Sequence, residues 1–144
     1  MRSRLNFNAT TQLLTIHMKT VSLLARLLLG LIFLVFGLNG FLNFIPMPPP
    51  TGVAGQYMGA LFVSHFLVAV FILQLVGGVL LLANRFVPIA LVLLGPVVVN
   101  ILLFHALMAP SGLAMAVVVT ALWFTVFWGV RRAFAGIFAI RATA

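Results

Sequence analysis

Apolar residues fill most of the chain in long runs, and polar residues interrupt these runs at only a few places. Between Arg26 and Arg85 lie 58 residues without a formal charge, and between Arg85 and Arg131 lie 45. A transmembrane helix needs about 20 predominantly apolar residues to cross a hydrocarbon core about 30 Å thick. Each stretch is therefore long enough for two crossings and a turn. The pattern predicts two helical hairpins.

Segments rich in proline and glycine divide each of these stretches. Residues 46–52 read Pro-Met-Pro-Pro-Pro-Thr-Gly, and residues 109–112 read Ala-Pro-Ser-Gly. Proline removes a backbone hydrogen bond and clashes with the preceding helical turn, so both segments are expected to lie between helices. The four spans that follow from these breaks are residues 22–44, 60–82, 87–107 and 112–130.

The spans define a membrane domain over residues 22–130, with a basic segment at either end. Residues 131–144 form a basic tail on the cytoplasmic side. Residues 1–21 are compatible with an interfacial helix and with a partly disordered segment. Because Met18 followed by Lys19 would also make a start, the sequence leaves open whether residues 1–17 belong to the native protein.

The composition supports a membrane protein and excludes several kinds of chemistry. The chain is 65% hydrophobic and 6% charged, whereas soluble domains carry about 25% charged residues. It has no Asp, Glu or Cys, so catalytic triads with a carboxylate, calcium cages and thiolate metal sites are not expected. No basic stripe with interleaved aromatic residues indicates nucleic-acid binding. We expect no metal site.

The basic residues predict the orientation of the chain in the membrane. All eight lie near the N-terminus, in the middle turn or near the C-terminus: Arg2, Arg4, Lys19, Arg26, Arg85, Arg131, Arg132 and Arg141. Basic residues concentrate in cytoplasmic loops. Both termini and the turn at Arg85 are therefore expected in the cytoplasm. The predicted fold is an all-α, polytopic four-transmembrane-helix bundle.

Several polar residues are expected in the outward part of the membrane, and four of them are the candidate site: Asn39, His65, Asn100 and His105. Ionisable and polar residues within membrane spans are candidates for function. Interhelical hydrogen bonds are one interpretation. Contacts to a quinone or another small ligand in an apolar pocket are a second. Haem held by two histidines is the least favoured, because two histidines alone are a weak signal. The sequence identifies no catalytic residue.

Three segments of the chain resemble the DoxX family of small membrane proteins. Residues 30–41 (GLIFLVFGLNGF) resemble its first helix, and residues 74–82 (QLVGGVLLL) with the Asn84-Arg85 turn resemble its second. The stretch from Pro88 through Gly95-Pro96 and Asn100 to His105 is similar to its third helix. The resemblance covers about residues 22–130. It implies a four-helix protein of the bacterial inner membrane, associated with DoxD-like proteins and with oxidoreductases such as thiosulfate:quinone oxidoreductase.

The function expected from this resemblance is that of an accessory or quinone-proximal subunit of a membrane oxidoreductase, rather than a self-sufficient enzyme. Many relatives carry an acidic residue near the two glycines where this chain has Gln74. Two alternatives stay open: a non-catalytic subunit at the edge of a respiratory or photosynthetic complex, and a small neutral-solute transporter. The expected partners are membrane lipid and other membrane subunits, with acidic surfaces or anionic lipid opposite the arginines.

Overall fold

A computed structural model describes the backbone of residues 2–138 and the side chains of residues 17–135. This part of the chain is helical and contains no strand, which confirms the all-α prediction. Its α-helices are α1 (Arg2–Leu42), α2 (Gly52–Val63), α3 (Phe66–Leu82), α4 (Val87–Leu107) and α5 (Leu113–Val130). Two 3-10 helices, η1 (Pro110–Gly112) and η2 (Arg131–Phe138), complete it. Arg141 lies outside the described residues.

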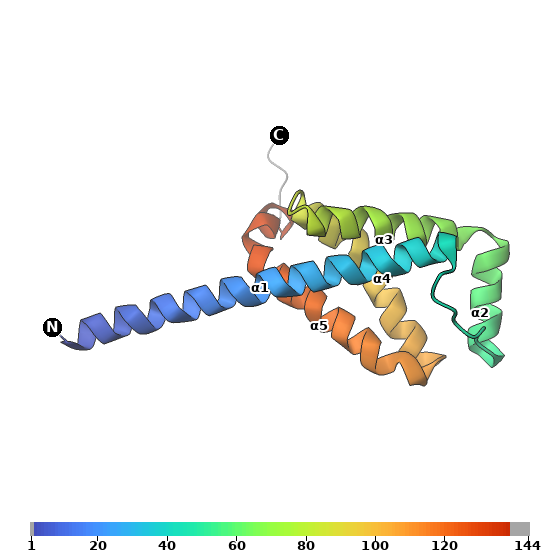
Figure 1. Ribbon diagram of the computed structural model, residues 1–144, viewed down its shortest axis with the longest axis horizontal. Helices are drawn as coiled ribbons and strands as arrows, with labels where there is room; N and C mark the ends of the chain where they lie inside the picture. The colour runs from blue at the N-terminus through green and yellow to red at the C-terminus, as the bar shows by residue number, and fades with distance from the viewer. Residues whose placement is uncertain (1, 139–144) are drawn as a thin grey trace.

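Four of the helices pack as a closed ring. Helix α1 contacts α3 and α5, and α4 contacts the same two helices from the other side. Figure 1 shows α1 and α3 side by side and antiparallel, with α4 and α5 as a second hairpin. The interior is apolar, and its largest fully buried side chains are Leu29, Phe33, Leu81, Leu91, Leu94 and Val126.

Several helices are long and apolar enough to cross a membrane, which indicates a multi-pass membrane protein. Three single spans have this character: His17–Leu42, Val87–Leu107 and Pro110–Ala135. The pair α2 and α3 would make a fourth if it is counted as one bent span. Helix α4 has the predicted bounds of the third span, and α5 begins one residue after the predicted start of the fourth.

The second predicted span, residues 60–82, is not one helix. It breaks at Ser64 and His65, and α2 is bent by 86° from α3. His65 has a φ of 60°, in the left-handed region that ends a right-handed helix. The Ser64 hydroxyl accepts a hydrogen bond from the Phe66 backbone N–H at 3.4 Å and donates one to the Leu61 carbonyl at 3.2 Å. Residues 60–63 therefore belong to α2, and α3 spans only about 25 Å.

The first predicted span is part of a longer helix. Helix α1 begins at Arg2 and ends at Leu42, so residues 2–21 continue the helix of the membrane span. In Figure 1 this N-terminal part of α1 extends past the other helices. Its position relative to a membrane surface stays a prediction.

The two glycines of α3 allow this helix to approach both of its neighbours. A Cβ atom on Gly78 would lie 2.8 Å from the backbone nitrogen of Leu34 in α1. A Cβ atom on Gly77 would lie 2.5 Å from the side chain of Leu94 in α4. Small residues at such positions let helix backbones come together in lipid, where no hydrophobic force drives association. This close approach fixes α3 between α1 and α4.

Two polar side chains at helix contacts donate hydrogen bonds to backbone carbonyls of neighbouring helices. A guanidinium N–H of Arg26 donates to the carbonyl of Leu81 in the last turn of α3, where the helix dipole favours a positive charge. The indole N–H of Trp123 in α5 donates to the carbonyl of Leu91 in α4 at 3.1 Å. Both residues therefore join neighbouring helices of the ring.

Candidate binding pocket

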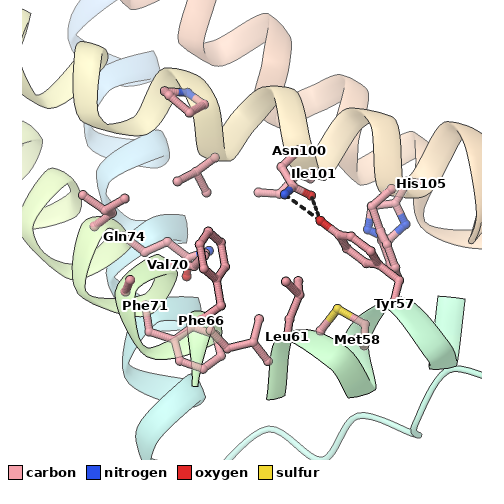
Figure 2. Close-up of a pocket in the computed structure, with 16 residues that line it drawn as sticks. Tyr57, Met58, Leu61, Phe66, Val70, Phe71, Gln74, Asn100, Ile101 and His105 are labelled. Atoms are coloured by element: carbon pink, nitrogen blue, oxygen red, sulfur yellow. Dashed lines mark hydrogen bonds between the residues drawn. The ribbon is translucent and has the colours of Figure 1, made fainter. Parts of the chain in front are cut away.

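A cavity of about 340 Å³ lies between α2, α3 and α4. Its wall is apolar and aromatic except for four polar residues, Tyr57, Gln74, Asn100 and His105. Figure 2 shows Gln74 on one side of this cavity and Tyr57, Asn100 and His105 on the other. A volume of this size, with few polar groups in an apolar wall, is typical of small-molecule sites. We call it the α2–α4 pocket.

The break between α2 and α3 creates this pocket. A straight continuation of α3 would carry residues 52–63 away from α4. The 86° bend instead carries α2 to α4, where the ring of Tyr57 lies 5.9 Å from that of Phe104. The pocket is the space left between the bent pair and α4.

Two hydrogen bonds between Tyr57 and Asn100 link α2 to α4. The Tyr57 hydroxyl donates to Asn100 Oδ1 at 3.1 Å and accepts from Asn100 Nδ2 at 2.9 Å. Each group thus satisfies the other at the wall of an apolar cavity, where an unpaired polar group costs free energy. One N–H of the Asn100 amide is left over, because an amide nitrogen carries two hydrogens.

The turn between α4 and α5 orients His105. Its Nδ1 lies 3.0 Å from the carbonyl oxygen of Ala109, and its ring meets that of Phe104 edge-on at 5.1 Å. A carbonyl oxygen can only accept, so Nδ1 carries the hydrogen. In the neutral ring Nε2 then has a free lone pair. Gly112 makes room for this ring, since a Cβ atom there would overlap it.

Gln74 brings a buried amide to the pocket from α3. Its side chain is 8% exposed, and its Oε1 accepts no hydrogen bond from the described residues. Buried polar atoms without a partner are rare in proteins. The Nε2 group of the same amide also makes no hydrogen bond to the described residues, and it is the less buried of the two amide atoms.

Of the four residues predicted to form the site, the structure brings two to the pocket. Asn100 and His105 line it. His65 is exposed at the break between α2 and α3, with its Nδ1 3.4 Å from the Phe62 carbonyl. Asn39 lies at the end of α1, where its Oδ1 accepts from the Ile45 N–H at 2.6 Å. The two histidines therefore do not share this pocket.

Tyr57 was not predicted as a site residue, and Gln74 was not assigned to the site. Tyr57 lies in a stretch that was expected to connect two spans, and it is the one tyrosine of the chain. Gln74 is the one polar side chain with a hydrogen-bonding amide in the otherwise apolar α3. This single polar position in an apolar helix was the sequence feature that could have indicated Gln74 as a site residue. No signal in the sequence pointed to Tyr57, because its role depends on the bend.

Comparisons with protein-family models, curated proteins and solved structures give no significant match for this chain. The resemblance to DoxX-like proteins therefore rests on the residues quoted above and stays a prediction.

Proposed function

We propose that this chain binds a small apolar molecule of the quinone class in the α2–α4 pocket and acts as an accessory subunit of a membrane oxidoreductase. The observation that carries the proposal is the pocket itself. It combines an apolar and aromatic wall with the Asn100 amide, the His105 imidazole and the Gln74 amide. Such a wall suits a ring, and the polar groups suit its oxygen substituents.

The residues of the chain supply binding and orientation in this proposal. A quinone-class molecule accepts and returns electrons when bound. The chain has no cysteine, the usual ligand of iron–sulfur clusters, so we assign the electron-transfer centre to a partner subunit. The second N–H of Asn100 would donate to a ring oxygen, His105 Nε2 would accept from a ring hydroxyl, and the aromatic side chains of the pocket would exclude water.

We further propose that both termini and the α3–α4 turn lie in the cytoplasm of a bacterial cell, with the pocket in the outward half of its inner membrane. In Figure 1 the α3–α4 turn and η2 lie at one end of the bundle, and α2 and the α4–α5 turn lie at the other. The first end carries Arg85, Arg131 and Arg132, and the loops of the second end carry no charged residue. This separation agrees with the preference of basic residues for the cytoplasmic side.

The absence of acidic residues favours a second candidate, a structural subunit of a larger membrane complex. Eight basic and no acidic residues leave the arginines without a carboxylate from their own chain. Acidic surfaces of partner subunits or anionic lipids would balance this charge. In this candidate the pocket holds a lipid chain, and the protein contributes contacts only.

Extraction of the chain from native membranes in a mild detergent distinguishes the quinone-binding subunit from the structural subunit. We expect co-elution with a redox protein and with quinone at a fixed stoichiometry. His105→Gln should lower the quinone content, whereas His65→Gln, a matched change outside the pocket, should not. Co-elution with other subunits but without quinone would favour the structural candidate. A lone chain that carries only lipid would contradict both.

A further inference from the structure

Helices α3 and α4 touch in the half of the bundle near the turn that joins them, and the α2–α4 pocket separates them in the other half. A Cβ atom on Gly77 of α3 would lie 2.5 Å from the side chain of Leu94 in α4, so the two helices are in close contact at this level. From there toward α2, the pocket lies between residues 66–74 of α3 and residues 96–105 of α4. The two helices therefore form its side walls.

Helix α2 forms the roof of the pocket. It is bent by 86° from α3, and in Figure 1 it lies across the right-hand end of the bundle. Its side chains Tyr57, Met58 and Leu61 line the pocket, and Figure 2 shows all three on the α2 side of the cavity. Helix α2 therefore stands between the pocket and the water beyond this end of the bundle.

The flank of the pocket, between α3 and α4, is made of exposed residues. Ala69 of α3 and both Pro96 and Asn100 of α4 line the cavity and are exposed. Pro96 lies inside α4, which ends at Leu107, and the axial distance between these two residues is about 16 Å. A hydrocarbon core is about 30 Å thick. An opening that reaches the level of Pro96 therefore lies deep in the bilayer and not at its surface.

The chemistry of this flank suits contact with lipid. Residues 27–84 and 86–130 carry no formal charge, so none of the three helices around the pocket brings a charged side chain to it. The Tyr57 hydroxyl and the Asn100 amide form two hydrogen bonds with each other, at 3.1 and 2.9 Å. In hydrocarbon, where no water is present to form hydrogen bonds, polar groups must be satisfied within the protein in this way.

We propose that the α2–α4 pocket opens sideways, between α3 and α4, into the bilayer and takes its ligand from the lipid rather than from water. This inference rests on the proposed function, which assigns an apolar molecule to the pocket, and adds the route by which that molecule enters. Apolar molecules concentrate in lipid because their transfer out of water is favourable. A ligand with an apolar tail places its ring in the pocket and leaves its tail between α3 and α4, among the lipid chains.

Spin labels on single cysteines test the direction of this opening, because the chain has no cysteine of its own. The full-length chain in lipid vesicles carries the label at Ala69→Cys, Val68→Cys or Ser111→Cys. Val68 is exposed on α3 beside Ala69 but does not line the pocket, and Ser111 is exposed in the turn between α4 and α5. We expect oxygen, which concentrates in lipid, to relax the labels at positions 69 and 68 more strongly than a water-soluble nickel chelate does. The reverse is expected at position 111. A label at position 69 that responds mainly to the nickel chelate would overturn the inference.

A bulky side chain at the opening tests whether the ligand occupies it. The probe is a benzoquinone with a long alkyl tail, and its binding to the full-length chain in nanodiscs is measured by equilibrium dialysis, with the uptake of empty nanodiscs subtracted. Ala69→Trp places an indole between α3 and α4 and should weaken binding by about tenfold or more, because the indole takes the space of the ligand. Val68→Trp, the matched change beside the opening, should leave binding unchanged.

The outcomes separate the inference from the proposed function. Unchanged binding in Ala69→Trp would overturn the sideways opening and leave the proposed function standing. Absence of binding to the unmodified chain would overturn the proposed function, whereas the spin labels would still decide whether the pocket opens to lipid. If Ala69→Trp fails to fold, the smaller change Ala69→Cys keeps the direction of the opening testable.

Discussion

At the scale of single residues, Gln74 places an amide where an apolar side chain would be more stable. Its Oε1 is buried without a partner, and an unsatisfied buried acceptor costs about 1–3 kcal/mol. We expect Gln74→Met to raise the free energy of unfolding of the ligand-free protein by about 1 kcal/mol. Chemical denaturation in detergent, followed by circular dichroism, measures this change.

The matched variant for this measurement is Gln56→Met. Gln56 is exposed on α2, and surface substitutions usually change stability by less than about 0.5 kcal/mol. A loss of stability in Gln74→Met would mean that the oxygen has a partner in the folded protein. The expected gain in stability of Gln74→Met would indicate that Gln74 serves binding rather than folding.

The site could be predicted from the sequence only where regular helix geometry decides it. Asn100 and His105 lie on α4, whose bounds follow from the pattern, so their shared depth could be worked out. Asn39 was predicted to face the pocket, but it instead binds the Ile45 backbone as the chain leaves α1. Such a local bond between an amide and the backbone depends on the path of the loop, which periodicity does not describe.

At the scale of helices, the position of α2 depends on Tyr57. The hydroxyl links α2 to Asn100 of α4, while the ring lies against that of Phe104. Tyr57→Phe keeps the ring contact and removes the hydrogen bonds, which are worth about 0.5–1.5 kcal/mol. We expect hydrogen exchange of the α2 amides to become faster by about threefold to tenfold.

Exchange in α3 serves as the internal reference for this prediction. Helix α3 is held by its packing against α1 and α4, so its amides should exchange at an unchanged rate in Tyr57→Phe. Faster exchange in both helices would mean that the bend does not separate α2 from the bundle. Unchanged exchange in both would mean that the ring contact alone holds α2.

The packing of α1 against α3 gives a second prediction at this scale. A Cβ atom on Gly78 would lie 2.8 Å from the backbone nitrogen of Leu34 and 2.9 Å from the backbone oxygen of Gly30. Backbone atoms cannot move aside as a flexible side chain can, so we expect Gly78→Ala to destabilise the protein by about 1–3 kcal/mol. Thermal unfolding in detergent measures this loss.

Gly59 provides the control for this substitution. No atom lies within 4 Å of a Cβ atom built on Gly59 of α2, and alanine favours the helix by about 1 kcal/mol over glycine. Gly59→Ala should therefore be neutral or stabilising. Equal losses in the two variants would contradict the assignment of Gly78 to a close contact between backbones.

The limits of α4 and α5 were predictable from the sequence, whereas the break within the second predicted span was not. Proline or glycine stands near both ends of α4 and just before the start of α5. In the structure these helices begin and end close to those residues. The break at Ser64 and His65 has neither residue. The left-handed conformation of His65 costs about 1–2 kcal/mol, and we attribute its compensation to the contacts of α2 with α4. Those contacts are distant in sequence, so a local pattern predicts an unbroken span.

At the scale of the whole molecule, the distribution of the basic residues and the arrangement of the helices together predict how the chain is oriented in the membrane. The chain has no cysteine, so a single cysteine can be placed at either end of the bundle and labelled without background. Ala83 lies at the exposed end of α3, beside the turn that carries Arg85. Ser111 is exposed in η1, in the turn between α4 and α5. Helix α4 separates the two positions.

A membrane-impermeant maleimide applied to intact cells should therefore label Ser111→Cys and should label Ala83→Cys only after the membrane is opened. The physical reason is that the basic residues favour the cytoplasm, while α4, with 21 residues, is long enough to cross the hydrocarbon core. The reverse pattern would place the α2–α4 pocket toward the cytoplasm and overturn the proposed orientation, but it would leave the fold intact. Labelling of both positions from the same side would contradict the membrane crossing of α4. In the expected orientation the pocket is reached from the outward half of the membrane, so the proposed function requires a redox partner with a surface on that side.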